Sequence, residues 1–226
     1  MVHAHAMKSL KTLLIFLAIM ALAGCGGSSL DGVNTPTPTP STPTTPAGTQ
    51  VFSFEKSLEG WSAHALDVYD PGQAPNAPPA IARWSVQHSG ERATSGHTAL
   101  KLSLDNLTDA GKVWIERPFS VQANQRYRVN VKYALATADF GDIGLWNLIT
   151  GVSAQPPRTR DQLMFQGNTG NGSPTDVGYQ WLEKTYSFDA TSAMNGKLYV
   201  TIGVWGTFEV PRAYYLDNVR VTLAKL

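Results

Sequence analysis

Apolar and polar residues alternate with a period of two along short segments of the chain after residue 50. The pattern is clear over 100–104, 127–133 and 198–204, where apolar side chains occupy every second position. Such alternation is typical of a half-buried β-strand, with one face in a core and the other in water. Further strands are predicted at 51–54, 81–88, 112–121, 143–149, 179–188 and 213–223. No segment of useful length shows a helical period, so the sequence predicts an all-β domain, an antiparallel sandwich or barrel.

The composition limits how this domain is stabilised and what it binds. The chain has one Cys among 226 residues, which excludes an internal disulfide, and a domain of about 175 residues buries a sufficient core without one. Setting aside Lys8, Lys11 and Asp31, the rest of the chain carries 16 basic and 16 acidic residues. A neutral domain without basic runs gives no electrostatic attraction for nucleic acid, so we expect no nucleic-acid partner.

The first 25 residues have the pattern of a bacterial export signal. Lys8 and Lys11 precede an apolar run of 11 residues, 13–23, which is too short to span a bilayer. The sequence Leu-Ala-Gly then leads directly into Cys25. This motif resembles the lipobox of bacterial lipoproteins, which implies a signal peptide over 1–24 and a diacylglyceryl group on Cys25. The alternative is an ordinary signal peptide followed by an incidental Cys.

Residues 25–49 have the composition of a disordered linker. Gly and Ser are followed by alternating Thr and Pro, which are unsuited to a helix interior or a central strand and favour extended polyproline II. At about 3.1 Å per residue, the linker would hold the domain, residues 50–226, up to roughly 70 Å from the lipid. Gly26 stands where an Asp commonly retains lipoproteins in the inner membrane, and this resemblance implies the outer membrane.

The order of motifs in the domain resembles that of a known family. In chain order the motifs are Phe52-Ser-Phe-Glu55 with Gly60-Trp61, Ser95-Gly-His-Thr-Ala-Leu-Lys-Leu102, Tyr127-Arg-Val-Asn-Val-Lys-Tyr133, Trp181 ahead of Thr185-Tyr-Ser-Phe188, and Tyr215-Leu-Asp-Asn-Val-Arg-Val221. This order is similar to that of galactose-binding-like jelly rolls, which include the CenC-type carbohydrate-binding modules. The resemblance covers nearly all of 51–224. It implies a jelly-roll β-sandwich, glycan binding, and structural roles for the two Trp residues of these motifs.

Asp217 is unusual in the last motif because it shares the parity of Val219, Val221 and Leu223, which places it on the inward side of the strand. A buried carboxylate needs hydrogen-bonding partners or a metal. In the family that the motifs resemble, an Asp at this place and an acidic residue in the opening motif help to bind a structural Ca²⁺. The resemblance therefore implies a calcium site at Glu55 and Asp217. The alternative is that Asp217 accepts backbone hydrogen bonds at a β-bulge and that Glu55 is a surface charge.

Some of the aromatic residues are candidates for binding a sugar, because flat Trp and Tyr rings provide apolar area with a polar group. The candidates lie opposite in parity to apolar strand residues or beside a side-chain amide: Trp114, Trp146, Tyr199 and Trp205. Outward residues of 127–133 would add polar contacts, namely Arg128, Asn130 and Lys132. The alternative for each aromatic residue is structural packing, and an aromatic residue on the second face could also be covered by a loop.

The sequence contains no catalytic signature of the nucleophile-elbow or His-Glu-x-x-His kind, and its domain histidines lie far apart. We therefore predict that the protein is not an enzyme. The leading hypothesis is a lipid-anchored, non-catalytic carbohydrate-binding lipoprotein of the bacterial envelope or cell surface, with a glycan and the membrane as partners. The alternatives are an envelope lipoprotein with a structural or protein-interaction role and, less favoured, a small polysaccharide lyase or hydrolase.

Overall fold

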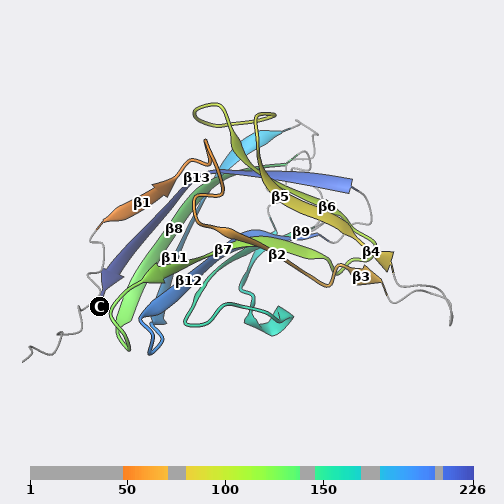
Figure 1. Cartoon of the computed structure of the whole chain (residues 1–226). Coiled ribbons are helices and arrows are strands. Elements are labelled where there is room, and N and C mark those ends of the chain that lie inside the picture. Colours follow the sequence, from red (N-terminus) through yellow and green to blue (C-terminus); the bar gives the residue numbers. More distant parts are fainter. Residues whose placement is uncertain (1–47, 71–79, 138–145, 169–178, 207–210) are drawn as a thin grey trace, which may run out of the picture. The chain divides into compact units, whose positions relative to one another are not determined.

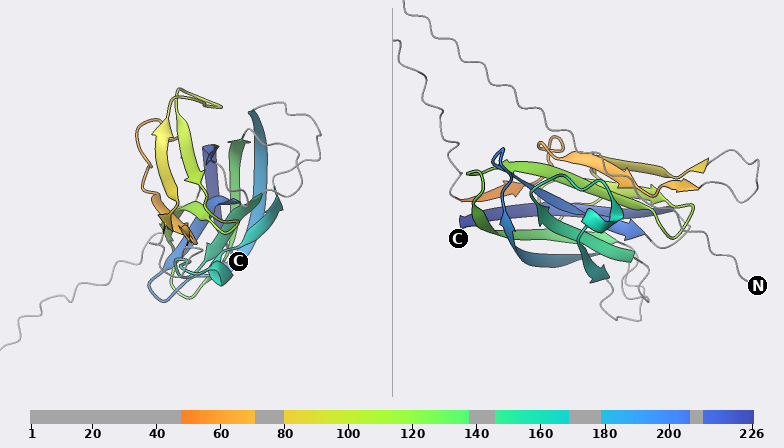
Figure 2. Two further views of the ribbon diagram at one scale, coloured as in Figure 1. Left: turned by 90° about the vertical axis from the view of Figure 1, so that its right-hand side faces the viewer. Right: turned by 90° about the horizontal axis from the view of Figure 1, so that it is seen from below.

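Two antiparallel β-sheets packed face to face make up the folded domain (Figures 1 and 2). The computed structural model describes residues 48–70, 80–137, 146–168, 179–206 and 211–226. Apart from the single 3-10 turn η1 (Arg160–Gln162), every regular element in these residues is a strand. The structure thus confirms the all-β, antiparallel β-sandwich that the sequence alternation predicts.

The strands that follow one another in the chain repeatedly cross from one sheet to the other, as in a jelly roll. The first sheet has the order β11 (Gln180–Thr191), β8 (Arg126–Thr137), β13 (Pro211–Lys225), β6 (Ala99–Asp105), β5 (Arg83–Ser89), and β1 (Thr49–Phe52) also pairs with β13. The second sheet has the order β10 (Phe165–Asn168), β9 (Trp146–Ser153), β12 (Lys197–Gly206), β7 (Lys112–Ser120), β2 (Ser62–Leu66). A small separate ladder joins β3 (Tyr69–Asp70) and β4 (Ala80–Ile81).

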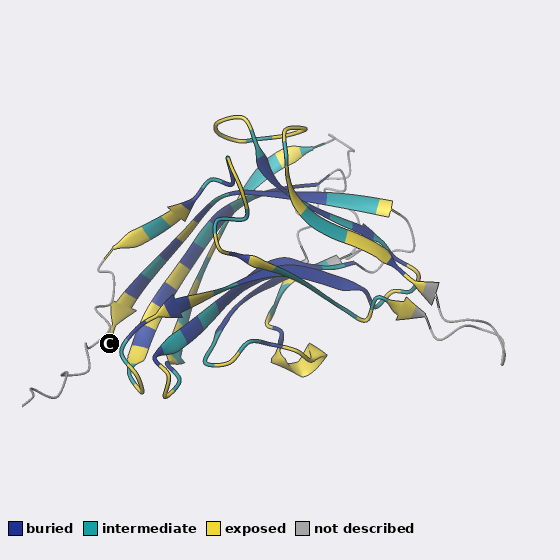
Figure 3. Ribbon diagram, in the orientation of Figure 1, coloured by how far each residue is buried: buried dark blue, intermediate teal, exposed yellow. Residues whose placement is uncertain are grey.

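The core lies between the inner faces of the two sheets. It contains the apolar positions of the three clearest alternating segments, in β6, β8 and β12, and the strands show buried and exposed bands in turn (Figure 3). Trp61 is also buried there, at 3% exposure, which agrees with the structural role that the resemblance implies. The sequence analysis did not identify the short strands β2, β3, β4 and β10.

A hydrogen bond crosses the core between the sheets. The hydroxyl of Tyr133 on β8 lies 2.6 Å from Oγ1 of Thr150 on β9, and both residues are buried. Burial raises the pKa of the Tyr133 hydroxyl, so it stays protonated and available as a donor. A polar contact in an apolar layer favours one relative placement of the sheets over others.

The last strand, β13, contains an irregularity that corrects one sequence prediction. Its pairing with β8 shifts register between Asp217 and Arg220, and Asn218 adopts a φ of 50°. As a result Leu216 and Val219 both face the core, although their parities differ. Asp217 is fully buried but does not share the inward side of Val219, because the bulge reverses the alternation before that residue.

The predicted export signal over 1–24, the predicted lipid attachment at Cys25 and the predicted linker up to residue 47 lie outside the described residues. Among the residues that the structure does describe, no helix has the length and apolar character needed to cross a membrane.

We expect Tyr133→Phe to lower the free energy of unfolding by about 1–3 kcal/mol, because the loss of its hydroxyl leaves the buried Thr150 hydroxyl without this partner. Combining it with Thr150→Val removes both polar groups and should recover part of the loss. Urea denaturation of the single and double variants measures the coupling. Strictly additive losses would contradict a stabilising bond between the sheets.

Candidate ligand-binding site

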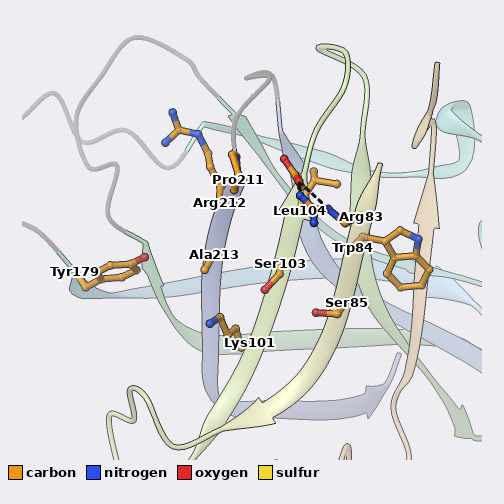
Figure 4. Close-up of a pocket in the computed structure, with 11 residues that line it drawn as sticks. Arg83, Trp84, Ser85, Lys101, Ser103, Leu104, Tyr179, Pro211, Arg212 and Ala213 are labelled. Carbon is orange, nitrogen blue, oxygen red and sulfur yellow. Dashed lines mark hydrogen bonds and ion pairs between the residues drawn. The ribbon is translucent and has the colours of Figure 1, made fainter. Parts of the chain in front are cut away.

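A hollow of about 570 Å³ opens on the outer surface of the first sheet, over β5, β6 and β13. We call it the first hollow. Its floor consists of small side chains in one row of the ladder, since Ser85 pairs with Ser103 and Ser103 with Ala213. Figure 4 shows these three on neighbouring strands, with Tyr179 to one side. The row of short side chains leaves space above the sheet that longer side chains would fill.

Charged residues line both ends of the first hollow. At one end, Arg83 donates from Nε and Nη2 to the same carboxylate oxygen of Asp105, at 3.0 and 2.6 Å. At the other end, the Lys101 ammonium lies 2.7 Å from both carboxylate oxygens of Glu91. This contact with Lys101 is the main reason that the pKa of Glu91 is lowered, and Glu91 in turn raises the pKa of Lys101. Both groups are therefore charged at neutral pH.

A ridge bounds the first hollow beyond Lys101. The Arg92 guanidinium lies 3.7 Å from the centroid of the Tyr179 ring, a cation–π contact. Beneath them Tyr215, only 2% exposed, contacts Tyr179 edge-on and donates its hydroxyl to Glu91 at 2.5 Å. We call Arg92 and Tyr179 the ridge.

A second, smaller hollow of about 220 Å³ lies on the same sheet over β8, β11 and β13. Its lining includes Lys132, Trp181, Glu183 and Arg220, and Lys132 pairs with Glu183 at 2.7 Å. The sequence analysis assigned Trp181 a structural role by resemblance, whereas here it is partly exposed and lines this second hollow. In the alternation of β11, Trp181 lies on the face opposite to the inward Tyr186. This parity could have identified Trp181 as an outward residue from the sequence.

The sequence placed its candidate aromatic residues on the other sheet. The parity argument is correct, because Val113, Ile115 and the apolar residues of β12 face the core while Trp114 belongs to a separate cluster on the outer side of the second sheet. The expectation that Trp114 is exposed is wrong, since its exposure is 2%. Residues 154–165 cover it: Leu163 is buried against Trp114 and Ile149, and Phe165 packs beside them.

Several contacts fasten this covering segment to the second sheet. Arg158 donates from Nη1 and Nη2 to the two carboxylate oxygens of Glu116, at 2.9 and 3.1 Å. The Met164 side chain packs where Gly151 has no Cβ, and the Arg160 guanidinium lies 4.8 Å from the Trp205 ring. The segment is therefore held by charge and by packing.

The remaining candidates are placed as follows. Trp205 is partly buried; its indole NH donates to the carbonyl of Asp109 at 2.9 Å, and Lys112 lies 4.9 Å from its ring. Tyr199 is partly buried at the position that pairs with Pro118 and Ser153. The backbone of Trp146 begins β9, but its side chain lies outside the described residues. The structure thus brings Trp114 and Trp205 together beneath one covering segment.

One cluster brings together residues that are distant in the sequence. The His64 ring stacks on Trp114 at 5.5 Å between centroids, and its Nε2 lies 3.9 Å from Glu116. Burial lowers the pKa of His64 more than Glu116 raises it. The imidazole is therefore neutral at pH 7, and Glu116 has Arg158 as its cationic partner.

Glu55 and Asp217 both hold the connection between β5 and β6. Asp217 accepts hydrogen bonds from the backbone NH groups of Thr94 and Ser95, at 2.9 and 3.1 Å. Glu55 accepts the backbone NH of His97 with both oxygens, each at 3.1 Å. Burial raises the pKa of Asp217, these amides lower it, and the nearby charge of Glu55 raises it further.

The calcium prediction fits this arrangement only in part. Two neighbouring carboxylates supply the hard oxygen ligands that Ca²⁺ prefers. The groups hydrogen-bonded to them are NH donors, however, which is the alternative that the sequence analysis left open for Asp217. Within the described part of the chain, no cluster of three or more His, Cys, Asp or Glu side chains is arranged to hold a metal. Calcium at Glu55 and Asp217 stays a prediction.

The fold and the two hollows define the class of the protein: a jelly-roll β-sandwich with an open, polar and hollowed surface on one sheet. No protein-family profile matches the sequence, and no curated protein matches it. Solved structures with a similar chain path include the CBM22-1 xylan-binding domain of Paenibacillus barcinonensis Xyn10C (16% identity, TM-score 0.41, 78% of this chain and 94% of that chain).

Two other similar structures have different functions. The K1 cleaved adhesin domain of Lys-gingipain from Porphyromonas gingivalis W83 shares 10% identity, with a TM-score of 0.45 over 77% of this chain and 98% of that chain. The Stig cyclase Fisc from Fischerella sp. TAU shares 15% identity, with a TM-score of 0.41 over 81% and 92%. The functional conclusion therefore depends on the chemistry of the site.

The raised pKa of Asp217 predicts a pH dependence of stability. Between the usual value of 3.8 and the raised folded value, the folded state binds a proton that the unfolded state does not. In EDTA, the contribution of Asp217 to the free energy of unfolding should therefore fall as pH rises through this window, and Asp217→Asn should remove that slope. Thermal melts of both proteins across pH 3–7 (roughly the range in which carboxyl groups titrate) measure it.

A calcium ion at this place would reverse the effect, because a cation favours the charged carboxylate. Millimolar calcium should then raise the melting temperature of the wild type but not of Asp217→Asn. If calcium leaves both melting temperatures unchanged, the calcium prediction is wrong.

Proposed function

We propose that the domain binds a carbohydrate in the first hollow. The observation that carries this proposal is the hollow itself: an open trough floored by Ser85, Ser103 and Ala213 and lined by a Tyr ring and charged groups. Its volume is within the range of about 300–1,000 Å³ that small-molecule sites occupy. A sugar presents an apolar face of C–H groups and a rim of hydroxyls, which match an aromatic side chain and a set of hydroxyl, carboxylate and guanidinium groups.

We propose further that this binding is non-catalytic. A general acid for glycoside cleavage needs a carboxyl group with a raised pKa. Glu91, which pairs with Lys101 beside the first hollow, has the opposite shift, because Lys101 and Tyr215 both hydrogen-bond to its charged form and lower its pKa. The Glu116–His64 pair on the second sheet lies under the covering segment, where Arg158 neutralises the carboxylate.

In this proposal the protein is a lipoprotein of the bacterial envelope, anchored by Cys25 in the outer membrane, that presents the sandwich on its Thr/Pro-rich linker. The supporting features are the lipobox-like sequence and the linker composition. An anchored binding domain would keep the cell, or a partner protein, close to polysaccharide.

Filling the first hollow should abolish glycan binding without unfolding the domain. We expect Ser103→Phe to lose binding on an array of neutral and acidic polysaccharides, because its ring would occupy the floor. Ser187→Phe is the matched control, since it makes the same substitution at an exposed outward position of β11. Equal binding by both variants, or absence of binding by the wild type across the whole array, would contradict the proposal.

The anchor is tested separately. Cys25→Ser removes the thiol that lipid attachment requires, so we expect the variant to move from the outer-membrane fraction to the soluble fraction of the cell envelope. Metabolic labelling with a fatty-acid analogue provides the matched measurement on the wild type. An unlabelled wild-type protein would show that Cys25 is not lipidated.

A further inference from the structure

The part of the outer surface of the first sheet that holds the two hollows and the ridge is rich in basic residues. Among the described residues, the two hollows and the ridge include six basic residues and two carboxylates, Asp105 and Glu183, and a third carboxylate, Glu91, pairs with Lys101 beside the first hollow. The formal net charge of the whole chain is only +1. The basic residues are Arg83, Arg92, Lys101, Lys132, Arg212 and Arg220. A local excess of positive charge on a nearly neutral protein raises the local concentration of anions.

The three carboxylates each neutralise a different cation. Asp105 pairs with Arg83, Glu91 with Lys101 and Glu183 with Lys132. Within the described residues, no carboxylate lies within ion-pair distance of Arg92 or Arg220. Both side chains are exposed, so their guanidinium groups can accept an external anion at little cost in desolvation.

The two hollows belong to one continuous surface. A single row of the ladder runs from Trp181 through Ala136 and Tyr215 to Lys101 on four neighbouring strands. Trp181 lines the second hollow and Lys101 the first, while the ridge with Arg92 lies over Tyr215 between them. Three strand spacings correspond to about 14 Å, which is more than one sugar ring spans.

We infer that the ligand is an anionic glycan, a sugar chain that carries carboxylate or sulfate groups, and that it crosses the ridge to occupy both hollows. The inference rests on the proposed function. Arg92 and Arg220 bind the anionic groups through the planar pair of NH donors that a guanidinium offers to an oxyanion. Trp181 supplies an apolar ring in the second hollow, and the small floor of the first hollow accommodates another sugar unit.

A glycan fits this surface better than a nucleic acid does. Phosphate backbones are bound by basic residues that line a continuous path and by aromatic platforms for the bases. Here carboxylates alternate with the cations along the surface. Such mixed charge suits a ligand with neutral hydroxyls between widely spaced anionic groups.

The test compares two ligands that differ only in charge. Isothermal titration calorimetry measures how tightly the full chain binds each ligand. Polygalacturonate and its fully methyl-esterified form share one sugar backbone and differ in whether the carboxylates are charged. Sulfated carrageenan and agarose provide a similar pair for sulfate. We expect at least one acidic member to bind about tenfold more tightly or better than its neutral counterpart. The difference should shrink as salt is raised.

Variants locate the contact. Arg92→Gln and Arg220→Gln should each weaken binding of the acidic glycan about tenfold and weaken binding of its neutral counterpart less, so that the preference for the acidic glycan narrows. Lys56→Gln removes the same charge from an exposed position in the β1–β2 connection and should change neither. Melting temperatures confirm that all variants are folded.

The outcomes separate this inference from the proposed function. Equal affinity for charged and neutral glycans, with no effect of the Arg variants, overturns the anionic ligand but keeps carbohydrate binding. Absence of binding to every glycan overturns both. Binding of single-stranded DNA more tightly than any acidic glycan, weakened by the same variants, would assign the surface to nucleic acid instead.

Discussion

The Asp217 carboxylate is the contact on which the outer surface of the first sheet depends. It lies at the bulge of β13 and accepts the NH groups of Thr94 and Ser95, which holds the β5–β6 connection down on the sheet. A buried carboxylate is unfavourable unless its oxygens are bonded, and buried NH groups are unfavourable without acceptors. The loop and the carboxylate therefore stabilise each other. Arg92, two residues before Thr94, is thereby placed over Tyr179, and the surface is divided into two hollows.

Similar aromatic and charged side chains have different roles on the outer faces of the two sheets. On the second sheet, Trp114 and Glu116 lie beneath residues 154–165, and Arg158 of that segment binds Glu116, so aromatic and charged groups stabilise the fold. On the first sheet, Trp181 and Arg220 line an open hollow that no described segment fills. Burial, rather than residue type, decides which aromatic residues are available to a ligand. Part of the outer face of the second sheet is therefore covered, whereas the two hollows on the first sheet are open.

The sequence predicted the fold, but it did not predict the first hollow, and the reason is physical. Alternation along one strand is local, so it identified the longer strands and the outward parity of Trp114 and Trp205, although it missed the short strands. Two other features depend on which strands become neighbours, and no local pattern encodes that. One is the burial of Trp114 under residues 154–165, and the other is the floor of the first hollow, formed by Ser85, Ser103 and Ala213. Three small residues on three separate strands are inconspicuous in a sequence, although together they form the floor of a hollow. The bulge at Asp217 likewise reverses a parity that the sequence alone leaves uninterrupted.

The position of β1 has a mechanical consequence. Thr49 pairs with Thr222 near the end of β13, whereas the first hollow lies beside Pro211 at the start of that strand, roughly 35 Å away. A pull between a membrane anchor and a held polysaccharide would therefore run along the strands. The backbone hydrogen bonds between β1 and β13 would then be loaded in shear. They would resist the pulling force together instead of breaking one after another. If the domain is anchored and binds a glycan as proposed, this geometry would resist a steady pull.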